Sequence, residues 1–323
     1  MAGRETGAFY TRGDKMPLAP EYQAMLAAAA AQPGPALSSL PAAAGREMYR
    51  MMRPANPAIT VGAVSDRGIP GPAGDIPVRV YRPDGAGPFP IFVNFHGGGW
   101  VIGDLDTADA LARDLCQTVG CVVVSVDYRM AHEALFPAAV DDCVAATRWV
   151  AAHQAELEGN GRLAVGGESA GGNLAAVVAQ IARDSGGPHI DLQVLLYPVT
   201  DSDLTRASYV ENGTGYLLER ATMQWFWDTY CPDVALRNDP RAAPIRAPNL
   251  ANLPHALVVT AEFDPLRDEG EAYGRALLAA GSSAEIRRFD GLVHDFCATA
   301  QVFTASRAAF TEICSHVRAR LHG

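Results

Sequence analysis

The chain has 323 residues, of which 49% are hydrophobic, and it carries a net charge of -10 at pH 7 with a pI of about 5.2. This length suits one large α/β domain or two smaller ones, and either can bury a substantial core. The acidic balance argues against a nucleic-acid partner, because binding to nucleic acid requires clustered lysines and arginines.

Targeting and cysteine patterns give further expectations. The first residues lack the apolar core of a signal peptide, and no apolar run approaches the length of a membrane span. The six cysteines include no Cys-x-x-Cys pair, which argues against zinc and redox motifs. We therefore expect a cytoplasmic protein with reduced, buried cysteines, without a membrane span or a metal site.

The first 55 residues differ from the rest of the chain. Two helical patterns, at residues 21–32 and 42–52, are separated by prolines, and no strand pattern accompanies them. Because isolated helices of this length are marginally stable, we expect this segment to cover another part of the protein.

From residue 59 onward, apolar segments typical of strands alternate with amphipathic segments typical of helices. The expected strands are residues 59–64, 78–81, 90–95, 121–126, 162–165, 192–197, 256–260 and 284–289. The first two form an antiparallel start, joined by a turn over residues 66–72. Helices are expected at residues 107–118, 138–156, after residue 169, and at 302–321. This alternation predicts an α/β fold with a mostly parallel eight-stranded sheet and helices on both faces.

One long segment interrupts the alternation. Residues 198–255 contain no strand pattern, and a connection of that length inside a compact domain usually has a function. Its aromatic residues suggest helices above the carboxyl edge of the sheet, where ligands of open α/β sheets bind. We expect a helical cap formed by residues 1–55 and an insertion at 200–250, on a core formed by 56–199 and 251–323. For two of Trp225, Phe226 and Trp227, packing within the cap is the simpler interpretation.

A serine lies among glycines where an expected strand meets an expected helix. Residues 166–172 read Gly-Gly-Glu-Ser-Ala-Gly-Gly, with Ser169 at the turn. A tight strand-to-helix turn of the Gly-x-Ser-x-Gly type needs residues without bulk at 167 and 171, and it exposes the serine hydroxyl above the sheet. The alternative is a helix N-terminus that cradles a phosphate. A P-loop would require Gly-Lys-Ser/Thr, and the only lysine is Lys15.

A serine nucleophile needs a base and an acid that orients the base. Of the five histidines after Ser169, His294 follows the final strand and therefore lies at the same sheet edge as the serine. The other four, His189, His255, His316 and His322, fall at the opposite edge or near the last helix. The acid should follow the preceding strand, where Asp264 stands immediately before a proline. Nearby Glu262 and Asp268 are expected to have supporting or capping roles.

Hydrolysis of an acyl group also needs donors for the oxyanion. Residues 96–100 read His-Gly-Gly-Gly-Trp and directly follow an apolar strand. The glycines leave backbone N–H groups free, so Gly97, Gly98 and Gly99, together with the N–H of Ala170, are the expected oxyanion donors. His96 is expected to hold this loop by hydrogen bonds.

Taken together, these motifs resemble those of the hormone-sensitive lipase family of carboxylesterases, the bacterial HGGG-type esterases, over nearly all of residues 50–320. The matching segments are 96–100, Gly-Asp at 103, Asp-Tyr-Arg at 127, 136–142, 166–172, 264–268 and His294. The resemblance implies an α/β-hydrolase fold and a triad of Ser169, Asp264 and His294. It also implies hydrolysis of short-chain acyl esters without a cofactor, a mobile cap, and a homodimer through the last strand and helix as a candidate assembly.

Two departures from the family pattern stand out. Residues 130–133 read Met-Ala-His-Glu, with His132 where relatives commonly have proline, which bears on the rigidity of this loop. Glu168 replaces an aspartate common in relatives. We expect Glu168 to point away from the substrate and to tie the turn to the loop at residues 127–129.

Several alternatives remain open from the sequence. An amidase, a lactonase or an acyltransferase would use the same residues, and a ligand-binding module with this fold would typically lack His294. The pocket walls are expected to include Tyr216, Leu217 and Leu218 from the cap. Trp100 is a further candidate for the pocket wall, with packing beneath the cap as its alternative.

Overall fold

The structure is a computed structural model that describes residues 17–323. Within these residues one sheet of eight strands runs in the order β1-β2-β4-β3-β5-β6-β7-β8. The strands are β1 (Ala63–Gly71), β2 (Gly74–Arg82), β3 (Phe89–Phe95), β4 (Val122–Val126), β5 (Gly159–Glu168), β6 (Leu192–Leu196), β7 (His255–Phe263) and β8 (Ala284–Val293). Only β2 runs antiparallel to its neighbours, so the predicted mostly parallel eight-stranded sheet is confirmed.

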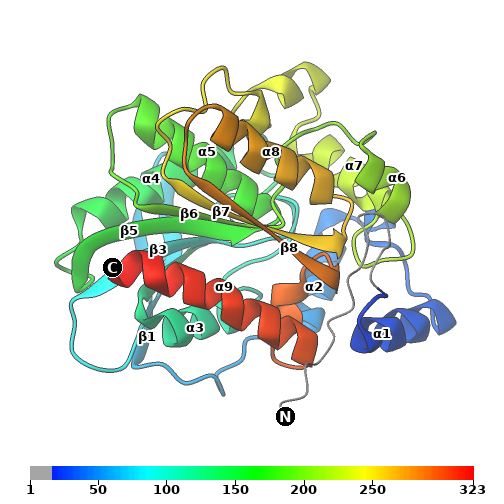
Figure 1. Ribbon diagram of the computed structural model, residues 1–323, viewed down its shortest axis with the longest axis horizontal. Coiled ribbons are helices and arrows are strands. Elements are labelled where there is room, and N and C mark those ends of the chain that lie inside the picture. The colour runs from blue at the N-terminus through cyan, green and yellow to red at the C-terminus, as the bar shows by residue number, and fades with distance from the viewer. Residues whose placement is uncertain (1–16) are drawn as a thin grey trace, which may run out of the picture.

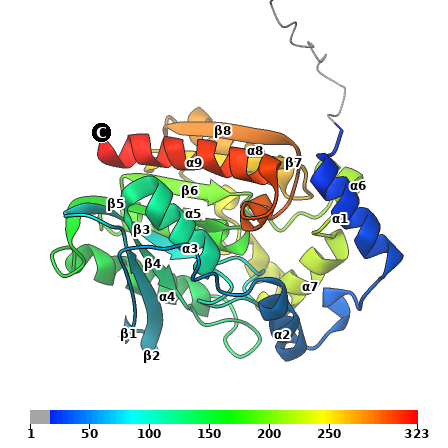
Figure 2. The ribbon, with the colours of Figure 1, turned by 90° about the horizontal axis from the view of Figure 1, so that it is seen from below.

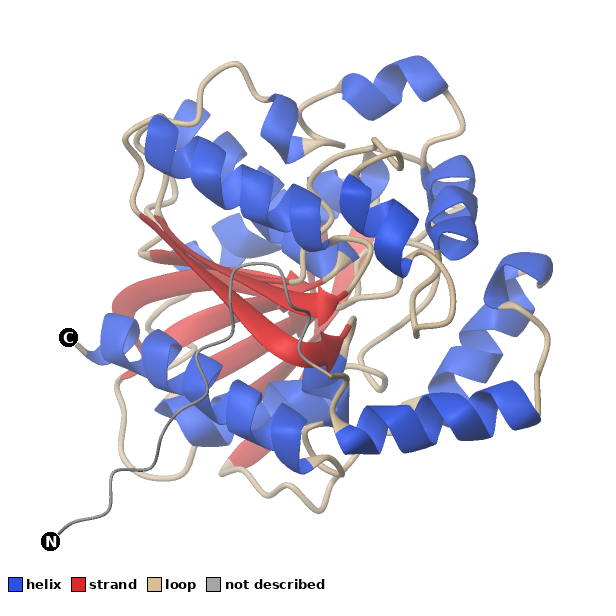
Figure 3. Ribbon diagram, turned by 45° about the vertical axis from the view of Figure 1, so that its right-hand side comes forward, coloured by secondary structure: helices blue, strands red, loops and turns tan. Residues whose placement is uncertain are grey.

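Helices cover both faces of the sheet, as Figures 1 and 3 show. One face carries α4 (Ala138–Ala152), α5 (Ala170–Asp184) and α8 (Arg267–Ala279), and the other carries α3 (Asp109–Leu115) and α9 (Thr304–His322). The alternation along β3 explains this arrangement, because Ile91, Val93 and Phe95 join the hydrophobic cluster on one face while Phe92 joins the cluster on the other.

The first hairpin differs from the prediction. Residues 66–71, expected in a turn, form most of β1, and Ile69 pairs with Ile76 so that the hairpin closes at residues 72–73. The Ile69 side chain is fully buried, which anchors this register. Pro70 is tolerated because β1 is an edge strand of the sheet. No strand lies on its outer side, so the N–H that proline lacks has no partner to lose there. The turn predicted over residues 66–72 is therefore wrong, because glycine and proline in this segment lie in a strand.

Other boundaries shift modestly. The expected helix at 107–118 is α3 followed by a wide turn at Cys116–Gly120, and α4 ends at Ala152 rather than residue 156. Strands β5, β7 and β8 are longer than expected at their carboxyl ends. Consequently the candidate residues Ser169, Asp264 and His294 each follow a strand end directly.

Four further helices gather beside the carboxyl ends of the strands in both Figure 1 and Figure 2. They are α1 (Pro20–Ala31), α2 (Ala42–Met52), α6 (Ala207–Asn212) and α7 (Arg220–Tyr230). Helix α1 is attached through Tyr22, whose buried hydroxyl lies 2.5 Å from Thr299 Oγ1 and 2.7 Å from Ser306 Oγ at the start of α9. Segments from the two ends of the sequence thus meet beside the same edge of the sheet.

Across residues 17–323, none of the helices combines the length and apolar character needed to cross a membrane.

Candidate active site

Ser169 occupies a strained turn between β5 and α5. Its backbone has φ 55° and ψ -113°, and its N–H donates to the carbonyl of Leu196 at 2.8 Å. A non-glycine residue in this region is held there only by its surroundings. A β-carbon at Gly167 or Gly171 would overlap the carbonyl oxygen of Phe95, so only glycine lets the turn lie this close to β3.

His294 and Asp264 meet at the ends of adjacent parallel strands. His294 Nδ1 lies 2.7 Å from Asp264 Oδ2, and Asp264 is fully buried. The other carboxylate oxygen, Oδ1, accepts the N–H of Leu266 at 2.8 Å, which fixes the orientation of the carboxylate. Because a carboxylate only accepts hydrogen bonds, Nδ1 carries the proton and Nε2 is left as the basic nitrogen.

The surroundings of His294 favour a protonated ring. Burial alone would lower the pKa of His294, but the carboxylate of Asp264, assisted by Asp295 and Glu168, raises it above its usual value. Tyr197, directly after β6, packs edge-on against the His294 ring with centroids 4.9 Å apart. The same Tyr197 donates its hydroxyl to Glu168 Oε1 at 2.8 Å, so it contacts the neighbour of Ser169 as well.

The glycine loop after β3 has the backbone geometry that glycine permits. Gly98 has φ 112° and Gly99 has φ 59°, and in the described part of the chain neither N–H donates to a protein oxygen. His96 lies under this loop: its Nδ1 is 2.8 Å from the carbonyl of Gly97, and its ring stacks on Tyr128 at 4.2 Å. Burial lowers the pKa of His96, which suits a neutral ring that holds the loop.

Helix α7 supports the glycine loop from above. Phe226 lies against Gly99, where a β-carbon would overlap its ring, and Trp100 stacks on Tyr230 with centroids 4.3 Å apart and an interplanar angle of 9°. The ring centroid of Trp227 lies 4.9 Å from that of Trp100, with the two rings tilted by 54°. Trp100 is fully buried by these contacts, which favours packing over a place in the pocket wall.

The expected pocket residues of the insertion differ in exposure. Tyr216 is half-buried, with its ring 5.2 Å from that of Phe263, whereas Leu217 is 41% exposed and Leu218 is buried. Ser169 and His294 are 8% and 7% exposed, so little of either side chain reaches solvent.

Glu168 has partners other than the one expected. Its Oε1 lies 3.1 Å from Arg53 Nη2 and accepts the hydroxyl of Tyr197, and it does not contact residues 127–129. The same Arg53 nitrogen lies 3.2 Å from Asp295 Oδ1, which brings a second carboxyl to this guanidinium. The loop at residues 127–129 is instead held by Asp142, which accepts from Arg129 at 2.8 Å. The expected link between Glu168 and that loop is therefore wrong, because Arg53 and Tyr197 occupy the space around this carboxylate.

The other two acids after β7 have supporting contacts. Glu262 Oε2 accepts the N–H of Gly291 at 2.8 Å, which joins β7 to β8 just before His294. Asp268 Oδ2 accepts the N–H of Ser208 at 2.8 Å and thereby ties α8 to α6. These contacts agree with the supporting roles expected for Glu262 and Asp268.

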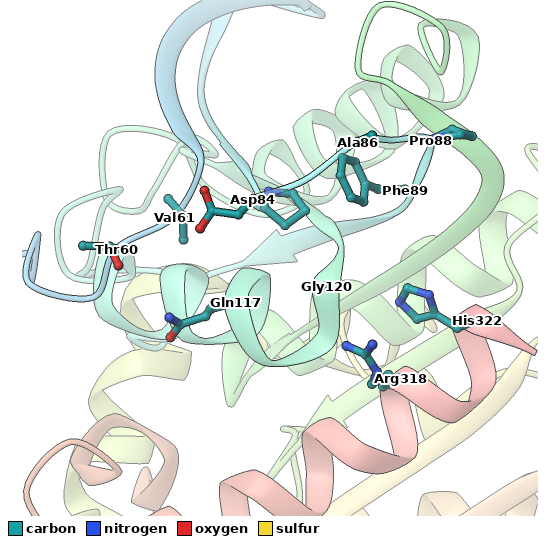
Figure 4. Close-up of a pocket in the computed structure, with 11 residues that line it drawn as sticks. Thr60, Val61, Asp84, Ala86, Pro88, Phe89, Gln117, Gly120, Arg318 and His322 are labelled. Carbon is teal, nitrogen blue, oxygen red and sulfur yellow. The ribbon is translucent and has the colours of Figure 1, made fainter.

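A pocket of about 470 Å³ lies at the opposite edge of the sheet, near the starts of β3 and β4 (Figure 4). Arg318 and His322 of α9 point toward it, but both bond to the carbonyl of Val119, at 3.1 and 2.9 Å. Their polar groups are thus engaged in closing the turn before β4. Within residues 17–323, no group of three or more histidine, cysteine or acidic side chains is arranged to hold a metal ion.

Comparison with known proteins identifies the class. Residues 92–298 match the family model described as the alpha/beta hydrolase fold. The match spans most of the chain, and the chain belongs to this family, as the sequence resemblance to hormone-sensitive-lipase-type esterases implied.

Individual relatives are similar over most of their length. The chain is 48% identical over 265 residues to the carboxylic ester hydrolase LipN of Mycobacterium tuberculosis, covering 80% of this chain and 70% of the relative. It is 43% identical over 229 residues to an ethyl acetate hydrolase of Pseudomonas putida, covering 68% and 71%. A thermostable esterase from Pseudomonas putida has a similar structure, with a TM-score of 0.90, 39% identity, and coverage of 96% and 99%.

Proposed function

We propose that the protein is a carboxylesterase in which Ser169, His294 and Asp264 act as nucleophile, base and orienting acid. The observation that carries this proposal is the 2.7 Å contact between His294 Nδ1 and Asp264 Oδ2 at the sheet edge where the strained turn presents Ser169. The names of the relatives, which are ester hydrolases, support the same reaction.

The reaction follows from the chemistry of these three groups. His294 Nε2 takes the proton of the Ser169 hydroxyl as its oxygen attacks the ester carbonyl, and Asp264 stabilises the imidazolium that forms. The imidazolium then protonates the departing alcohol, which leaves an acyl-serine. A water molecule, deprotonated by His294, attacks this acyl group and releases the acid with Ser169 regenerated.

The oxyanion formed in both steps needs donors. The N–H groups of Gly97, Gly98, Gly99 and Ala170 are the proposed source, supported by the positive φ of Gly98 and Gly99 and by the absence of protein acceptors for these two among the described residues. Where measured, removing one such donor costs about 3 kcal/mol of transition-state stabilisation.

The proposed substrates are esters with short acyl chains, and the helices beside the carboxyl edge are the proposed cap. The low exposure of Ser169 and the ethyl acetate hydrolase among the relatives support this proposal. Tyr216, Leu217 and Leu218 are the proposed pocket residues. A homodimer through β8 and α9 and a cytoplasmic location remain proposals, the latter supported by six cysteines that are all buried and free.

Replacement of Ser169 by alanine tests the assignment. The Ser169→Ala variant should lose hydrolysis of p-nitrophenyl butyrate while its circular dichroism and melting temperature stay near those of the parent. Covalent labelling of the parent by an organophosphate, absent in the variant, would locate the nucleophile at Ser169. Near-normal turnover by the variant would overturn the assignment. A series of p-nitrophenyl esters from acetate to dodecanoate then measures the preference for acyl-chain length.

A further inference from the structure

One cation from the N-terminal region contacts the neighbours of both the nucleophile and the base. Arg53 directly follows α2, and its side chain is 12% exposed. Its Nη2 atom lies 3.1 Å from Glu168 Oε1 and 3.2 Å from Asp295 Oδ1. Glu168 immediately precedes Ser169 and Asp295 immediately follows His294, so a single guanidinium joins the two loops on which hydrolysis depends.

The two carboxyl groups held by Arg53 also interact with each other. Each of the two carboxyl groups lies within 3.2 Å of the same Arg53 nitrogen, so their charges act on each other at short range. Burial, opposed by Arg53 and reinforced by Glu168, raises the pKa of Asp295 to about 7. Burial would also raise the pKa of Glu168, but Arg53 and the Tyr197 hydroxyl hold it below its usual value. Near neutral pH, Glu168 is therefore ionised, while Asp295 titrates in this range and carries a growing negative charge as the pH rises through about 7.

Among residues 17–323, the other groups that contact this cluster include no second arginine or lysine. Arg53 Nη1 donates to the hydroxyl of Tyr49 on α2, Tyr197 donates to Glu168, and the Cys297 thiol lies nearby, where burial raises its pKa. His294 itself contacts the carboxylate of Asp264 through Nδ1. The charged groups that act on the His294 ring are thus the carboxyls of Asp264, Asp295 and Glu168, and the last two pair with Arg53.

We propose that Arg53 is a positioning residue for ester hydrolysis: it clamps Glu168 and Asp295 together and offsets their negative charge, so that His294 is neutral and able to accept the proton of Ser169 near neutral pH. This inference rests on the proposed roles of Ser169 and His294. On this proposal, Arg53 and the segment after α2 affect the charge of His294, in addition to lying beside the edge of the sheet.

Coulomb's law gives the direction in which the pKa of His294 changes when Arg53 is lost. Asp295 and Glu168 both favour the imidazolium form of His294, so loss of Arg53 leaves their charge uncompensated and His294 binds its proton more tightly. At the separations of neighbouring side chains in a partly buried site, one unit charge moves a pKa by roughly half a unit to one unit. Removal of the Asp295 charge should have the opposite effect.

The test is the pH profile of kcat/KM for p-nitrophenyl butyrate in four single variants. In Arg53→Met, the acid limb should move up by about half a unit to one unit, whereas Arg53→Lys, which keeps the charge, should leave the limb near its parental position. Asp295→Asn should move the limb down. Arg50→Met is the matched control, because Arg50 also pairs an α2 side chain with the core, through Asp104 at 2.5 Å, without contacting Glu168 or Asp295. The acid limb of the Arg50→Met profile should not move.

A second readout does not depend on activity. In the Ser169→Ala background, an NMR titration of the His294 ring should show the same upward shift with Arg53→Met and the same downward shift with Asp295→Asn. A uniform loss of kcat/KM at every pH with an unmoved limb in both variants would overturn the proposal, as would an equal shift in Arg50→Met. If Arg53→Met fails to fold, Asp295→Asn decides the matter, since an unmoved or raised limb in that variant contradicts the charge argument. None of these outcomes bears on the nucleophile, which the activity of Ser169→Ala tests separately.

Discussion

The ring of Phe226 in α7 lies against the backbone of Gly99, so closely that a β-carbon at Gly99 would overlap it. The contact joins the long insertion to the loop that carries the proposed oxyanion donors. Because Gly99 also has φ 59°, two independent constraints exclude a side chain at this position.

Replacing Gly99 by alanine should therefore impair both stability and activity. Overpacking and left-handed strain together should cost about 2 to 4 kcal/mol of the free energy of unfolding. Displacement of the N–H groups should lower kcat about 100-fold or more. Gly281→Ala is the control, since Gly281 has φ 85° but open space around it, so only the strain remains and kcat should not change. A Gly99→Ala enzyme with parental kcat would contradict the proposed use of this loop.

Asp264→Asn should lower kcat by about 10⁴, because an amide in place of the carboxylate favours the wrong tautomer of His294. Glu262→Gln is the informative comparison. Its side-chain oxygen can still accept the N–H of Gly291, and we expect kcat within a few fold of the parent. Steady-state kinetics of both variants at pH 8 would decide between the two acids, and a large loss confined to the Glu262 variant would assign the orienting role to that residue.

The pH dependence of the parent enzyme follows from the raised pKa of His294. The base must be neutral to accept a proton, so kcat/KM should fall tenfold per unit as the pH drops below this pKa. Burial opposes the shift, but Asp264, Asp295 and Glu168 overcome it, and the midpoint of the acid limb should lie above 6.5. A profile of kcat/KM between pH 5 and 9 measures it, and a midpoint well below 6.5 would show that these carboxyls do not act on the ring as described.

A buried glutamate away from the site should make the protein less stable at high pH. Burial raises the pKa of Glu269 well above its usual value of 4.5, even though its Oε1 accepts the N–H of Thr200 at 2.8 Å. A carboxyl with a raised pKa in the folded state stabilises the fold below the unfolded pKa of 4.5 and loses this contribution as the pH rises through the folded value.

Glu269→Gln should consequently raise the melting temperature at pH 8 by about 1 to 3 °C and have less effect at pH 5. Glu271→Gln on the same helix is the control with the opposite sign. Although burial acts to raise its pKa, the ion pairs with Arg288 and Arg275 lower it, and the substitution should reduce the melting temperature at pH 8. Equal changes in melting temperature in Glu269→Gln and Glu271→Gln would contradict the effect assigned to the burial of Glu269.

The sequence was sufficient for the features that depend on strand order. Apolar segments and the glycines around Ser169 predict a parallel sheet, and the carboxyl ends of parallel strands share one edge. For that reason Asp264 and His294, 30 residues apart, could be predicted to approach each other, as the 2.7 Å contact between them shows.

The partners of Glu168 could not be found in the same way. Arg53 lies 115 residues before Glu168 and 242 before Asp295, in a segment whose helical pattern says nothing about which core loop it meets. Asp295 directly follows His294 in the sequence. Its importance depends on Arg53, which only folding brings into contact with it. The first hairpin was missed for a local reason, because Gly68, Pro70 and Gly71 have turn propensities that the burial of Ile69 in an edge strand overrides.

The attachment of Tyr22 to Thr299 and Ser306 has a consequence for biosynthesis. The residues that make these hydrogen bonds are separated by 277 and 284 positions in the chain. During translation at 5 to 20 residues per second, the first helix waits on the order of tens of seconds for its partners to emerge from the ribosome. The segment that ends in Arg53 can therefore take its final place only after Asp295, Thr299 and Ser306 have been synthesised, that is, after all eight strands of the described sheet.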